Sequence, residues 1–545
     1  MARIGIDFGT ANTVIAVYNE QVQQAETLEV TDISMKMSHR VDANSPEQIV
    51  HIIPSIIHYG KDQTLIGNQV LFQGLVEHQD TFRWMKQLIA RRNNRFKKTS
   101  QGLKLAVDAG REFLTLLIKY ISNKVSLTDD EFTFTAPTES FETFQDWLRS
   151  VAEFAGIKRL RIIDEPTAAV LGYRTAATRD ELFLQYDHGC GTLNVAVVRL
   201  DLSSPSEKKA IHLGQAGRDG IGGMNIDCWI ADDFCRRHRI EPELRKKIEA
   251  LILFQAESTK ISLSDPACKE VDMMIQIEED GKHNICKTTY TRSCEHCERG
   301  LVGGTGVSDR ACLGCLLIAN GFQKNVRETI ERALENAAIK SGVRRQDIAQ
   351  ALVTGGTSLM PCVNNILGDF FGERVQYQNP YDAVVRGACR GIVIPVLQHD
   401  YAIESWNREK QQYEFVPLFK MGDYYPTKPE EVVQLWARGS YDGMERIGLK
   451  IFEVSQMKRM KLSESILDEE GHLLEESRVV TNYVYVCLNS KNPTFITANP
   501  PVNIKRDQKR FLCTFRVDEQ RRLLVTVYDK LTDKSLMQDH PVVRL

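Results

Sequence analysis

Two segments of the chain carry the same few residue types, and these types could hold a phosphate group and a metal ion. Asp7–Asn12 reads Asp-Phe-Gly-Thr-Ala-Asn, and Asp187–Thr192, about 180 residues later, reads Asp-His-Gly-Cys-Gly-Thr. Glycines let the backbone approach a phosphate closely, and turn N–H groups and threonine hydroxyls can donate hydrogen bonds to its oxygens. The aspartates can hold a hydrated Mg²⁺, a hard cation that prefers oxygen ligands. Either segment alone could be an ordinary turn, but the repetition favours one site between two related lobes.

Each of these segments lies between two predicted strands. Arg3–Asp7 and Thr13–Tyr18 flank the first segment, and Leu182–Tyr186 and Val195–Leu200 flank the second. Short β-prone runs on both sides of a glycine-containing turn predict a hairpin in each case. His188, inside the second turn, could carry charge beside a phosphate or act only as a spacer.

Three further turns resemble parts of a nucleotide site. Glu165 follows a predicted strand and precedes Pro166, which suits a first helical turn. Gly222 and Gly223 open a predicted helix whose first N–H groups would face outward. The segment 351–361 reads as a strand, a double-glycine turn and a helix.

Four of the thirteen cysteines form a pattern that suits a metal. Cys294 and Cys297 are separated from Cys312 and Cys315 by fourteen residues, and the glycine-rich stretch 300–306 lies between the two pairs. Two Cys-x-x-Cys pairs at this spacing favour a tetrahedral zinc site. Two redox pairs, or four unrelated buried thiols, are the alternatives. Since zinc binds thiolates, binding would depend on pH and couple to local folding.

Composition excludes several classes of protein. The chain has 545 residues, with 69 lysines and arginines against 72 aspartates and glutamates, for a net charge of −3. This balance excludes a global positive field that would attract nucleic acid. No apolar run approaches the ~20 residues that cross a bilayer, and the first residues read as a strand rather than a signal peptide. The length predicts about three to five globular units or lobes. We expect a soluble, cytoplasmic protein.

The pattern changes after residue 398. Residues 399–412 are polar and charged, which predicts a linker, whereas 413–545 contains runs of alternating apolar residues separated by turn-rich gaps. Such alternation indicates an antiparallel β-domain.

Taken in order, these segments resemble the DnaK-type 70-kDa heat-shock chaperones, members of the actin-like ATPase superfamily. The resemblance covers roughly residues 1–398 and, more weakly, 413–545, and Glu-Pro-Thr-Ala-Ala at 165–169 is its most specific part. It implies an α/β fold, with an actin-like two-lobed nucleotide-binding domain at 1–398. A β-sandwich resembling a substrate-binding domain would follow at 413–545, without the helical lid of the family. The four-cysteine zinc knuckle at 292–318 is an insert that the family does not supply.

The resemblance also implies roles for individual residues. Lys86 matches the catalytic lysine that reaches the γ-phosphate, Glu165 the residue that positions the attacking water, and Thr192 a hydroxyl beside the γ-phosphate. Asp7 and Asp187 match carboxylates that hold magnesium through water. The resemblance also places Asp187 among the catalytic residues. The positions that match ATP contacts are Asp7, Gly9, Thr10, Ala11, Asn12, Gly189, Gly191, Gly222, Gly223, Glu257, Lys260, Ser264, Gly355, Gly356 and Ser358.

The chain departs from the family at several of these positions. Cys190 replaces a glycine of the second phosphate loop, and Asn194 replaces an aspartate near the cation. Ile261 and Leu359 stand where the family has arginines beside the adenine. The apolar interdomain linker of the family is also missing. These departures predict ATP binding with hydrolysis that is slower than usual.

The leading prediction is therefore an atypical DnaK-like chaperone that binds and hydrolyses ATP to switch its binding of protein or peptide clients. The alternative is an ATP-binding regulatory scaffold with slow or absent hydrolysis. A co-chaperone or nucleotide-exchange partner is expected at the second lobe, where the knuckle would replace or modify a partner surface. Neither a membrane nor a nucleic acid is an expected partner.

Overall fold

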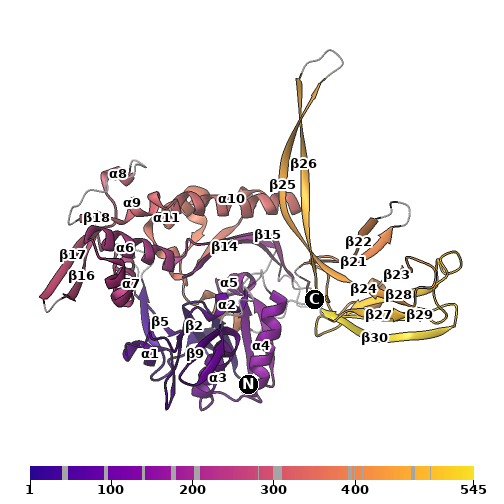
Figure 1. The fold of residues 1–545 in the computed structure, drawn as a ribbon, viewed down its shortest axis with the longest axis horizontal. Coiled ribbons are helices and arrows are strands. Elements are labelled where there is room, and N and C mark those ends of the chain that lie inside the picture. Colours follow the sequence, from indigo (N-terminus) through magenta and orange to yellow (C-terminus); the bar gives the residue numbers. More distant parts are fainter. Residues whose placement is uncertain are drawn as a thin grey trace. The chain divides into compact units, whose positions relative to one another are not determined.

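The computed structural model describes the chain except for residues 40–46, 91–95, 138–140, 174–179, 202–208, 280–281, 299–309, 391–395, 398, 408–409, 411, 468–472 and 491. The glycine-rich stretch expected at 300–306 falls outside the described residues. The chain divides into two units (Figure 1). The first comprises Met1–Glu207 and His212–Ile392, and the second comprises Lys208–Ile211 and Val393–Leu545.

The first lobe of the first unit is a mixed sheet with the strand order β12-β11-β1-β2-β5-β4, and β3 pairs with β2. β1 and β2 form the expected hairpin around Asp7–Asn12, and β11 runs parallel to β1. The strands are β1 (Arg3–Phe8), β2 (Asn12–Asn19), β3 (Gln24–Thr27), β4 (Met35–His39), β5 (Gln48–Pro54), β11 (Glu131–Ala136) and β12 (Leu160–Asp164).

Two amphipathic helices bury their apolar faces in the core of this lobe. In α3 (Ala106–Ile121), Phe113, Leu117 and Ile121 recur at helical spacing and are completely buried. α4 (Phe141–Ala155) adds Leu148 and Val151 to the same core. This packing fixes the sheet, and with it the turn between β1 and β2.

The second lobe repeats this arrangement in the order β15-β14-β13-β19-β20. β13 and β14 form a hairpin around Asp187–Thr192, and β19 runs parallel to β13 as β11 does to β1. Asp7 and Asp187 therefore stand at corresponding strand ends, and the prediction of two related lobes is confirmed. The strands are β13 (Glu181–His188), β14 (Thr192–Asp201), β15 (Lys209–Asp219), β19 (Gln350–Thr354) and β20 (Val375–Gln376).

Two short helices cross at the base of the unit with almost no space between their backbones. α5 (Glu165–Tyr173) contacts β12 and β14, and α12 (Ala383–Ala388) contacts β1 and β2. A Cβ on Gly172 would lie 1.8 Å from Ala383 O, and one on Gly387 would lie 1.8 Å from Ala168 O. Only glycine permits this approach, which connects the two sheets through one helix pair.

The remaining elements of the first unit extend the two lobes. The second lobe carries at its outer end a three-stranded sheet, in the order β16-β17-β18, beside α6 and α7 (Figure 1). The strands are β6 (Ile57–Tyr59), β7 (Thr64–Ile66), β8 (Thr81–Phe82), β9 (Phe96–Thr99), β10 (Gly102–Leu105), β16 (Glu270–Glu279), β17 (Lys282–Thr291) and β18 (Arg310–Cys312). The helices are α1 (Asn68–Phe72), α2 (Met85–Ala90), α6 (Gly223–Arg237), α7 (Pro242–Ser264), α8 (Glu295–Glu298), α9 (Leu313–Ala319), α10 (Phe322–Ser341) and α11 (Pro361–Phe371). Among the helices that the structure describes, none is long and apolar enough to span a membrane.

The second unit is a β-sandwich, as predicted. Its sheets have the orders β22-β21-β25-β26 and β23-β28-β29-β30, and β24 pairs with β27. Both larger sheets contribute to one core, for example Tyr401 and Phe419 from the first and Phe515 and Val525 from the second. The strands are β21 (Asp400–Asn407), β22 (Gln412–Phe419), β23 (Val433–Ala437), β24 (Arg446–Leu449), β25 (Ile451–Leu467), β26 (Leu473–Cys487), β27 (Thr494–Thr497), β28 (Phe511–Val517), β29 (Arg522–Asp529) and β30 (Lys534–Arg544).

The predicted polar linker at 399–412 is wrong where the structure describes it. Asp400–Asn407 forms β21, which pairs with β22 on one side and with β25 on the other. Tyr401 and Ile403 are buried in the sandwich core, Ala402 between them is buried as well, and polar residues follow from Glu404. The prediction fails because the charged and polar residues of the segment outnumber its short apolar run at 401–403, which is too brief to indicate a strand by itself.

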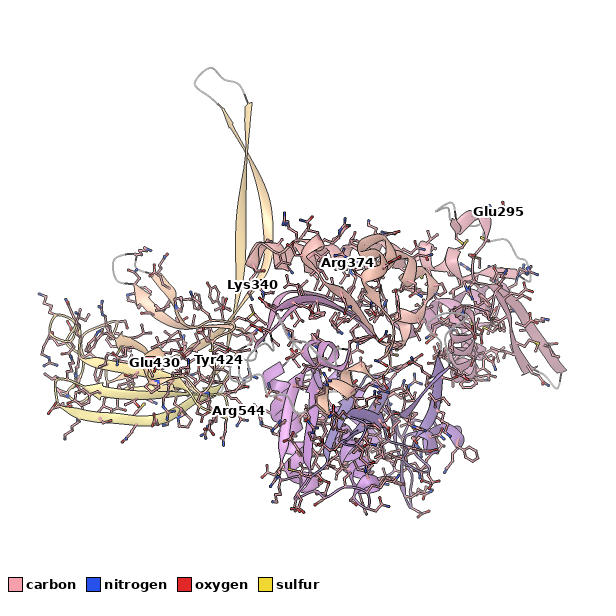
Figure 2. The ribbon with its side chains drawn as sticks, turned by 180° about the vertical axis from the view of Figure 1, so that it is seen from behind. Glu295, Lys340, Arg374, Tyr424, Glu430 and Arg544 are labelled. Carbon is pink, nitrogen blue, oxygen red and sulfur yellow. The ribbon has the colours of Figure 1, made fainter. Side chains whose placement is uncertain are left out.

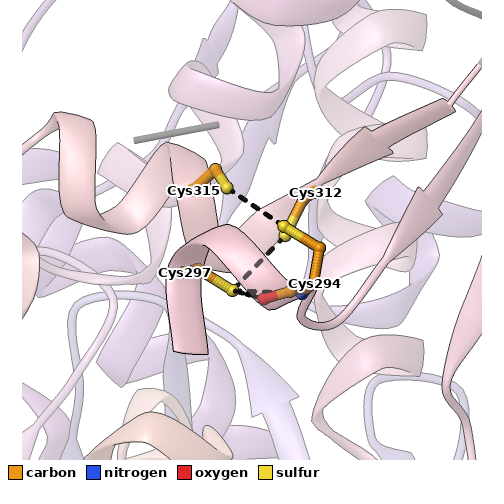
Figure 3. Close-up of side chains that lie close together, drawn as sticks. All are labelled: Cys294, Cys297, Cys312 and Cys315. Carbon is orange, nitrogen blue, oxygen red and sulfur yellow. Dashed lines mark hydrogen bonds between the residues drawn. The ribbon is translucent and has the colours of Figure 1, made fainter. Parts of the chain in front are cut away.

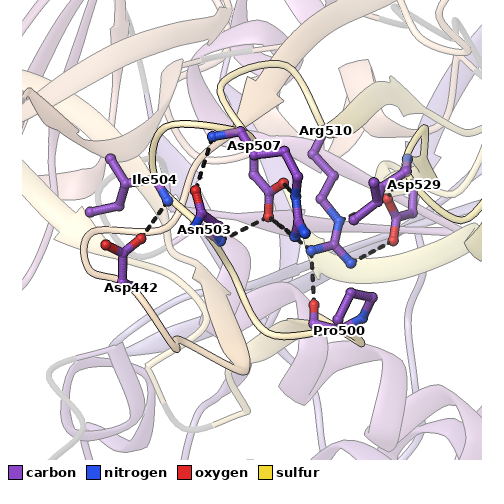
Figure 4. A network of polar contacts seen from close by, with 9 residues as sticks. Asp442, Pro500, Asn503, Ile504, Asp507, Arg510 and Asp529 are labelled. Atoms are coloured by element: carbon purple, nitrogen blue, oxygen red, sulfur yellow. Dashed lines mark hydrogen bonds and ion pairs between the residues drawn. The ribbon is translucent and has the colours of Figure 1, made fainter.

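A buried charge network supports the second sheet of the sandwich (Figure 4). Arg510 Nε and Nη2 donate to the two carboxylate oxygens of Asp529, each at 2.9 Å. Nη1 donates to Asp507 Oδ2 at 3.0 Å and to Pro500 O at 2.8 Å. Burial acts to raise the pKa of Asp529, but the hydrogen bonds and charge of Arg510, together with hydrogen bonds from Leu531 and Thr532, lower that pKa. Both carboxylates are therefore buried in their charged form. Asp529 depends on Arg510, whereas Asp507 also pairs with Arg506.

Replacing this cation is expected to destabilise the sandwich strongly. Arg510→Ala leaves the buried Asp529 without its cation and removes one of the two arginines that contact Asp507, which costs roughly 3–5 kcal/mol in the free energy of unfolding. Arg516→Ala is the matched control because Arg516 pairs with Asp539 at the surface, and it should cost less than about 1 kcal/mol. Urea unfolding of the full chain measures both, and equal losses would contradict the assignment.

Candidate functional site

A cavity of about 1200 Å³ opens between the two lobes of the first unit and gathers most of the predicted nucleotide residues. Its walls come from the β1–β2 turn, the β13–β14 turn, α2, α5, α7 and the segment after β19. The predicted residues that line it are Asp7, Gly9, Thr10, Ala11, Asn12, Lys86, Glu165, Asp187, Gly189, Gly191, Thr192, Gly223, Glu257, Lys260, Ser264, Gly355 and Gly356. Two predicted residues do not line it, namely Gly222 and Ser358.

A buried ion pair lies at the centre of the cavity wall. Lys86 Nζ, on α2, donates to Glu165 Oε1, at the start of α5, over 2.6 Å. Burial favours the neutral forms of both groups, and for Glu165 it is the main reason that the pKa is raised. For Lys86, the attraction of Glu165, Asp7 and Asp187 exceeds the effect of burial, so the pKa of Lys86 is raised as well. The site thus holds a firmly charged cation beside a carboxylate that can exchange a proton near neutral pH.

Two aspartates from the corresponding strand ends complete this charged centre. Asp7 Oδ1 accepts a hydrogen bond from Thr135 Oγ1 at 2.6 Å, and Asp187 Oδ1 accepts one from Thr354 Oγ1 at 3.0 Å. Each threonine lies on the parallel strand beside its aspartate, and it leaves the rest of the carboxylate available to the cavity. Burial raises the pKa of Asp187. Since a divalent cation would relieve that penalty, the donor set suits Mg²⁺.

Glu165 is held in place by a second, fully buried pair. Asp164 Oδ1 accepts hydrogen bonds from the backbone N–H of Thr167 at 2.8 Å and faces His212 Nε2, also at 2.8 Å. Burial acts to raise the pKa of Asp164, but His212 and Thr167 outweigh it and lower that pKa. Asp164, the residue before Glu165, therefore accepts from an N–H in the first turn of α5. Through His212 it also connects the start of this helix to β15 of the second lobe.

The second phosphate loop is held by hydrogen bonds from two other segments. Gly189 N–H donates to Thr192 O at 3.0 Å within the loop, and Gly189 O accepts from Gly223 N–H at 3.1 Å. Thr357 Oγ1 donates to the same oxygen at 2.9 Å. Two segments far from the loop in the sequence thus help to fix it, and Thr357 is a contributor that the sequence motifs did not reveal.

The turn after β19 requires glycine at one position. Gly355 has φ of +85°, and a Cβ there would lie 2.4 Å from His188 O. Ser358 is fully buried and its hydroxyl donates to Gly355 O, so its contact supports the turn rather than lining the cavity.

Lys260, predicted to contact the nucleotide, forms an ion pair within the protein. Its ammonium is 2.7 Å from Asp227 Oδ1 and donates to Gly223 O at 3.1 Å, so it connects α7 to the start of α6. Burial raises the pKa of Asp227 to about 6. Lys260 still lines the cavity, but as the partner of a carboxylate that no motif had indicated.

The departures from the family pattern face the cavity. Cys190, Asn194, Ile261 and Leu359 all line it. Asn194 Nδ2 donates to Thr192 Oγ1 at 3.4 Å, and burial raises the pKa of Cys190 to about 11, so this residue stays a neutral thiol near pH 7. On the side of Ile261 and Leu359, adenine would meet apolar side chains.

His188 lies buried beneath the second phosphate loop. Its Nε2 is 2.8 Å from Ile221 O, and its Nδ1 is 2.9 Å from Tyr186 Oη. Because a carbonyl only accepts, Nε2 carries the proton and Nδ1 accepts from the tyrosine. Burial lowers the pKa of His188 to about 4. His188 is therefore a neutral support of the loop and does not carry charge beside a phosphate.

The four cysteines of the insert converge outside the nucleotide cavity (Figure 3). Cys294 directly precedes α8 and Cys297 lies within it, whereas Cys312 ends β18 and Cys315 lies in α9. The four sulfur atoms lie within 4.8 Å of one another, with 3.4 Å between Cys294 and Cys315 and 3.7 Å between Cys297 and Cys312. Four sulfurs around one zinc ion at Zn–S of about 2.3 Å lie roughly 3.8 Å apart. The group could thus hold a tetrahedral metal ion.

Fold and site together define a two-lobed α/β unit with a charged, glycine-lined cavity, followed in the chain by a β-sandwich. Residues 145–298 match the family described as "Hsp70 protein". Similar curated proteins include the chaperone protein DnaK of Deinococcus proteolyticus, 27% identical over 418 residues, which are 71% of this chain and 58% of that protein. The chaperone protein HscA homolog of Pseudoalteromonas atlantica is 24% identical over 391 residues, 68% of this chain and 54% of that protein.

The chain is thus similar to Hsp70 proteins over part of its length, and its first unit has a two-lobed α/β fold. The chain spans less than two thirds of the length of the curated relatives named above.

The buried His188 predicts a specific loss of stability in acid. An unfolded histidine binds a proton below a pKa of about 6.5, whereas the folded one resists until about pH 4. The contribution is therefore intact above pH 6.5 and is lost as the pH falls from 6.5 to 4. Between pH 7.5 and pH 5 the loss is about 2 kcal/mol. His188→Gln should remove this part of the pH dependence in urea unfolding.

The control is His540→Gln, which replaces an exposed histidine. It should unfold with the pH dependence of the wild type. If His188→Gln also kept that dependence, the burial of a neutral His188 would be contradicted.

Proposed function

We propose that the chain is an Hsp70-type ATPase that binds ATP in the cavity and uses its hydrolysis to switch the binding of protein or peptide clients. The observation that carries this proposal is the buried Lys86–Glu165 pair, 2.6 Å long, between two buried aspartates and two glycine loops. Such a concentration of charge is unfavourable without a ligand that neutralises it, and a phosphate chain with Mg²⁺ is a ligand of that kind.

Each group has a distinct task in the reaction. Asp7 and Asp187 would hold hydrated Mg²⁺, which supplies positive charge to the phosphate oxygens. Lys86 stabilises the negative charge that develops on the γ-phosphate. Glu165 accepts a hydrogen bond from the attacking water, and its raised pKa lets it take the proton as the bond between the γ-phosphorus and the bridging oxygen breaks. The Thr192 hydroxyl would donate to a γ-phosphate oxygen.

A slower reaction is supported by one specific substitution. Asn194 lies in the cavity beside Thr192 and supplies an amide where a carboxylate would hold a cation more strongly. A chain that binds ATP and hydrolyses it slowly would act as a regulatory scaffold, and this is the second candidate.

The four-cysteine group is proposed to hold one structural zinc ion. All four ligands are sulfur, which leaves no open coordination position for catalysis. The group lies near the outer end of the second lobe, where Glu295 of α8 extends from the unit (Figure 2). We propose that the zinc-bound insert forms part of a surface for a co-chaperone or nucleotide-exchange partner. All thirteen cysteines are free thiols, which suits a reducing cytoplasm.

Steady-state ATP hydrolysis tests the catalytic pair. Lys86→Ala is expected to lower turnover by about 10²–10³-fold, because one charged donor to the transition state is lost. Glu165→Gln should lower it by at least about tenfold. Lys104→Ala is the matched control, since Lys104 pairs with Glu112 at 2.7 Å outside the cavity, and it should hydrolyse ATP normally.

Tight ATP binding with equal turnover in all four proteins would contradict the catalytic roles. Tight binding without measurable turnover in the wild type would favour the scaffold over the enzyme.

Metal analysis tests the cysteine group. The purified wild-type chain is expected to contain about one zinc ion, and the double variant Cys294→Ser/Cys297→Ser should contain none, because two of four ligands are lost. Cys268→Ser is the control, since Cys268 lies nearby but outside the group. Less than about 0.3 zinc per wild-type chain would contradict the site.

A further inference from the structure

One arginine connects the cysteine group to the wall of the nucleotide cavity. Arg292 directly follows β17, and its guanidinium reaches the C-terminal end of α7. Its Nε donates to Leu263 O at 2.9 Å and its Nη1 to Pro266 O at 3.5 Å. Its Nη2 donates to the carbonyl oxygens of Asp265 and Cys268. One side chain thus serves four carbonyl groups.

One of these carbonyl groups, that of Leu263, belongs to the last turn of α7 and needs a partner from outside the helix. α7 ends at Ser264, so the last carbonyls of the helix have no N–H ahead of them within the helix. A guanidinium offers five donors in a rigid planar fork, and its positive charge suits the negative end of a helix. A side chain with fewer donors would form fewer hydrogen bonds to the turn after α7.

The segment that Arg292 holds forms one wall of the cavity. Glu257, Lys260, Ile261 and Ser264 of α7 line the cavity, and so does the turn at 265–267. Arg292 itself lies in the same wall. A shift of the α7 end would therefore move cavity-lining groups directly.

The backbone of Arg292 is held by the cysteine group. Arg292 O accepts a hydrogen bond from Gly314 N–H at 3.1 Å, and Gly314 lies between Cys312 and Cys315. A Cβ on Gly314 would lie 2.7 Å from Cys297 Sγ, so the backbone of this residue packs directly against a cluster sulfur. Thr291, the preceding residue, pairs with Cys312 in the parallel register of β17 and β18.

We propose that Arg292 is a positioning residue through which metal in the cysteine group strengthens nucleotide binding. The proposal rests on the proposed function, because it requires both a metal in the insert and a nucleotide in the cavity. Metal fixes the backbone around Cys294, Cys312 and Gly314, this backbone fixes Arg292, and Arg292 fixes the end of α7. Because binding couplings are reciprocal, nucleotide strengthens metal binding by the same factor.

Calorimetric titration with MgADP tests this coupling without hydrolysis, on the full-length chain. With zinc bound, the wild type should bind MgADP about five- to fiftyfold more tightly than after removal of zinc by a chelator. Arg292→Gln should retain one zinc ion but bind MgADP more weakly, and removal of zinc should then change its affinity less than about twofold. In Arg292→Lys, part of the zinc effect should remain, because lysine keeps the charge with fewer donors.

Arg374→Gln is the matched control. Arg374 also serves the end of a helix, donating from Nε to Phe371 O at 3.2 Å and from Nη1 to Ile348 O at 2.7 Å, but it does not line the cavity. It lies well apart from Glu295 of the insert in Figure 2. Its loss should lower stability about as much as the loss of Arg292 and leave the effect of zinc on MgADP affinity intact.

Transfer of zinc to a chromogenic chelator gives an independent reading. MgADP should slow this transfer in the wild type and in Arg374→Gln, but not in Arg292→Gln. A role of Arg292 in stability alone would not separate the two variants in this way.

Three results would overturn the proposal. One is an MgADP affinity of the wild type that zinc does not change, and another is a zinc effect in Arg292→Gln as large as in the wild type. The third is an equal affinity for MgADP of the zinc-bound Arg292→Gln and Arg374→Gln variants. This comparison remains valid even if the zinc-free chain does not stay folded. Failure of the zinc-bound wild type to bind MgADP at all would instead contradict the proposed function, and the coupling with it.

Discussion

The first unit depends on the burial of several charges of opposite sign in one place. Lys86 and Glu165 lie 2.6 Å apart with their side chains only 12% and 11% exposed, and Asp7 and Asp187 lie close enough to shift the pKa values of both. Taking these groups out of water is unfavourable unless each has a partner. The two lobes supply these partners from different sheets, so the charged centre exists only when both sheets are in register around it.

The surrounding structure serves to hold that centre rigidly. The hairpin turns are fixed by hydrogen bonds from segments far away in the chain, and the close crossing of α5 and α12 ties the two sheets together. The buried Asp164–His212 pair fixes the start of α5, on which Glu165 lies. A carboxylate that is to orient a water molecule must be held to within a fraction of an ångström, and these contacts provide that precision.

At the outer end of the second lobe, the cysteine insert is likewise held by contacts between segments that are distant in the sequence. It is joined to β17 and β18, and Arg292 carries its position to the end of α7. Ile261 and Leu359 give this part of the cavity apolar walls, so under the proposed function nucleotide affinity there would depend more on the placement of α7.

The sequence by itself determined the two hairpin turns, the glycine turns, the Cys-x-x-Cys pairs and the β-sandwich, because each depends on local spacing of a few residue types. Only the tertiary structure decided that Lys260 pairs with Asp227, that Ser358 is buried, that His188 is neutral and that 400–407 is a strand. These features depend on which distant segments meet. Thr135, Thr354 and Arg292 left no local signal for the same reason, since a hydroxyl or a guanidinium gains its role only from the carboxylates or carbonyls that the fold brings to it.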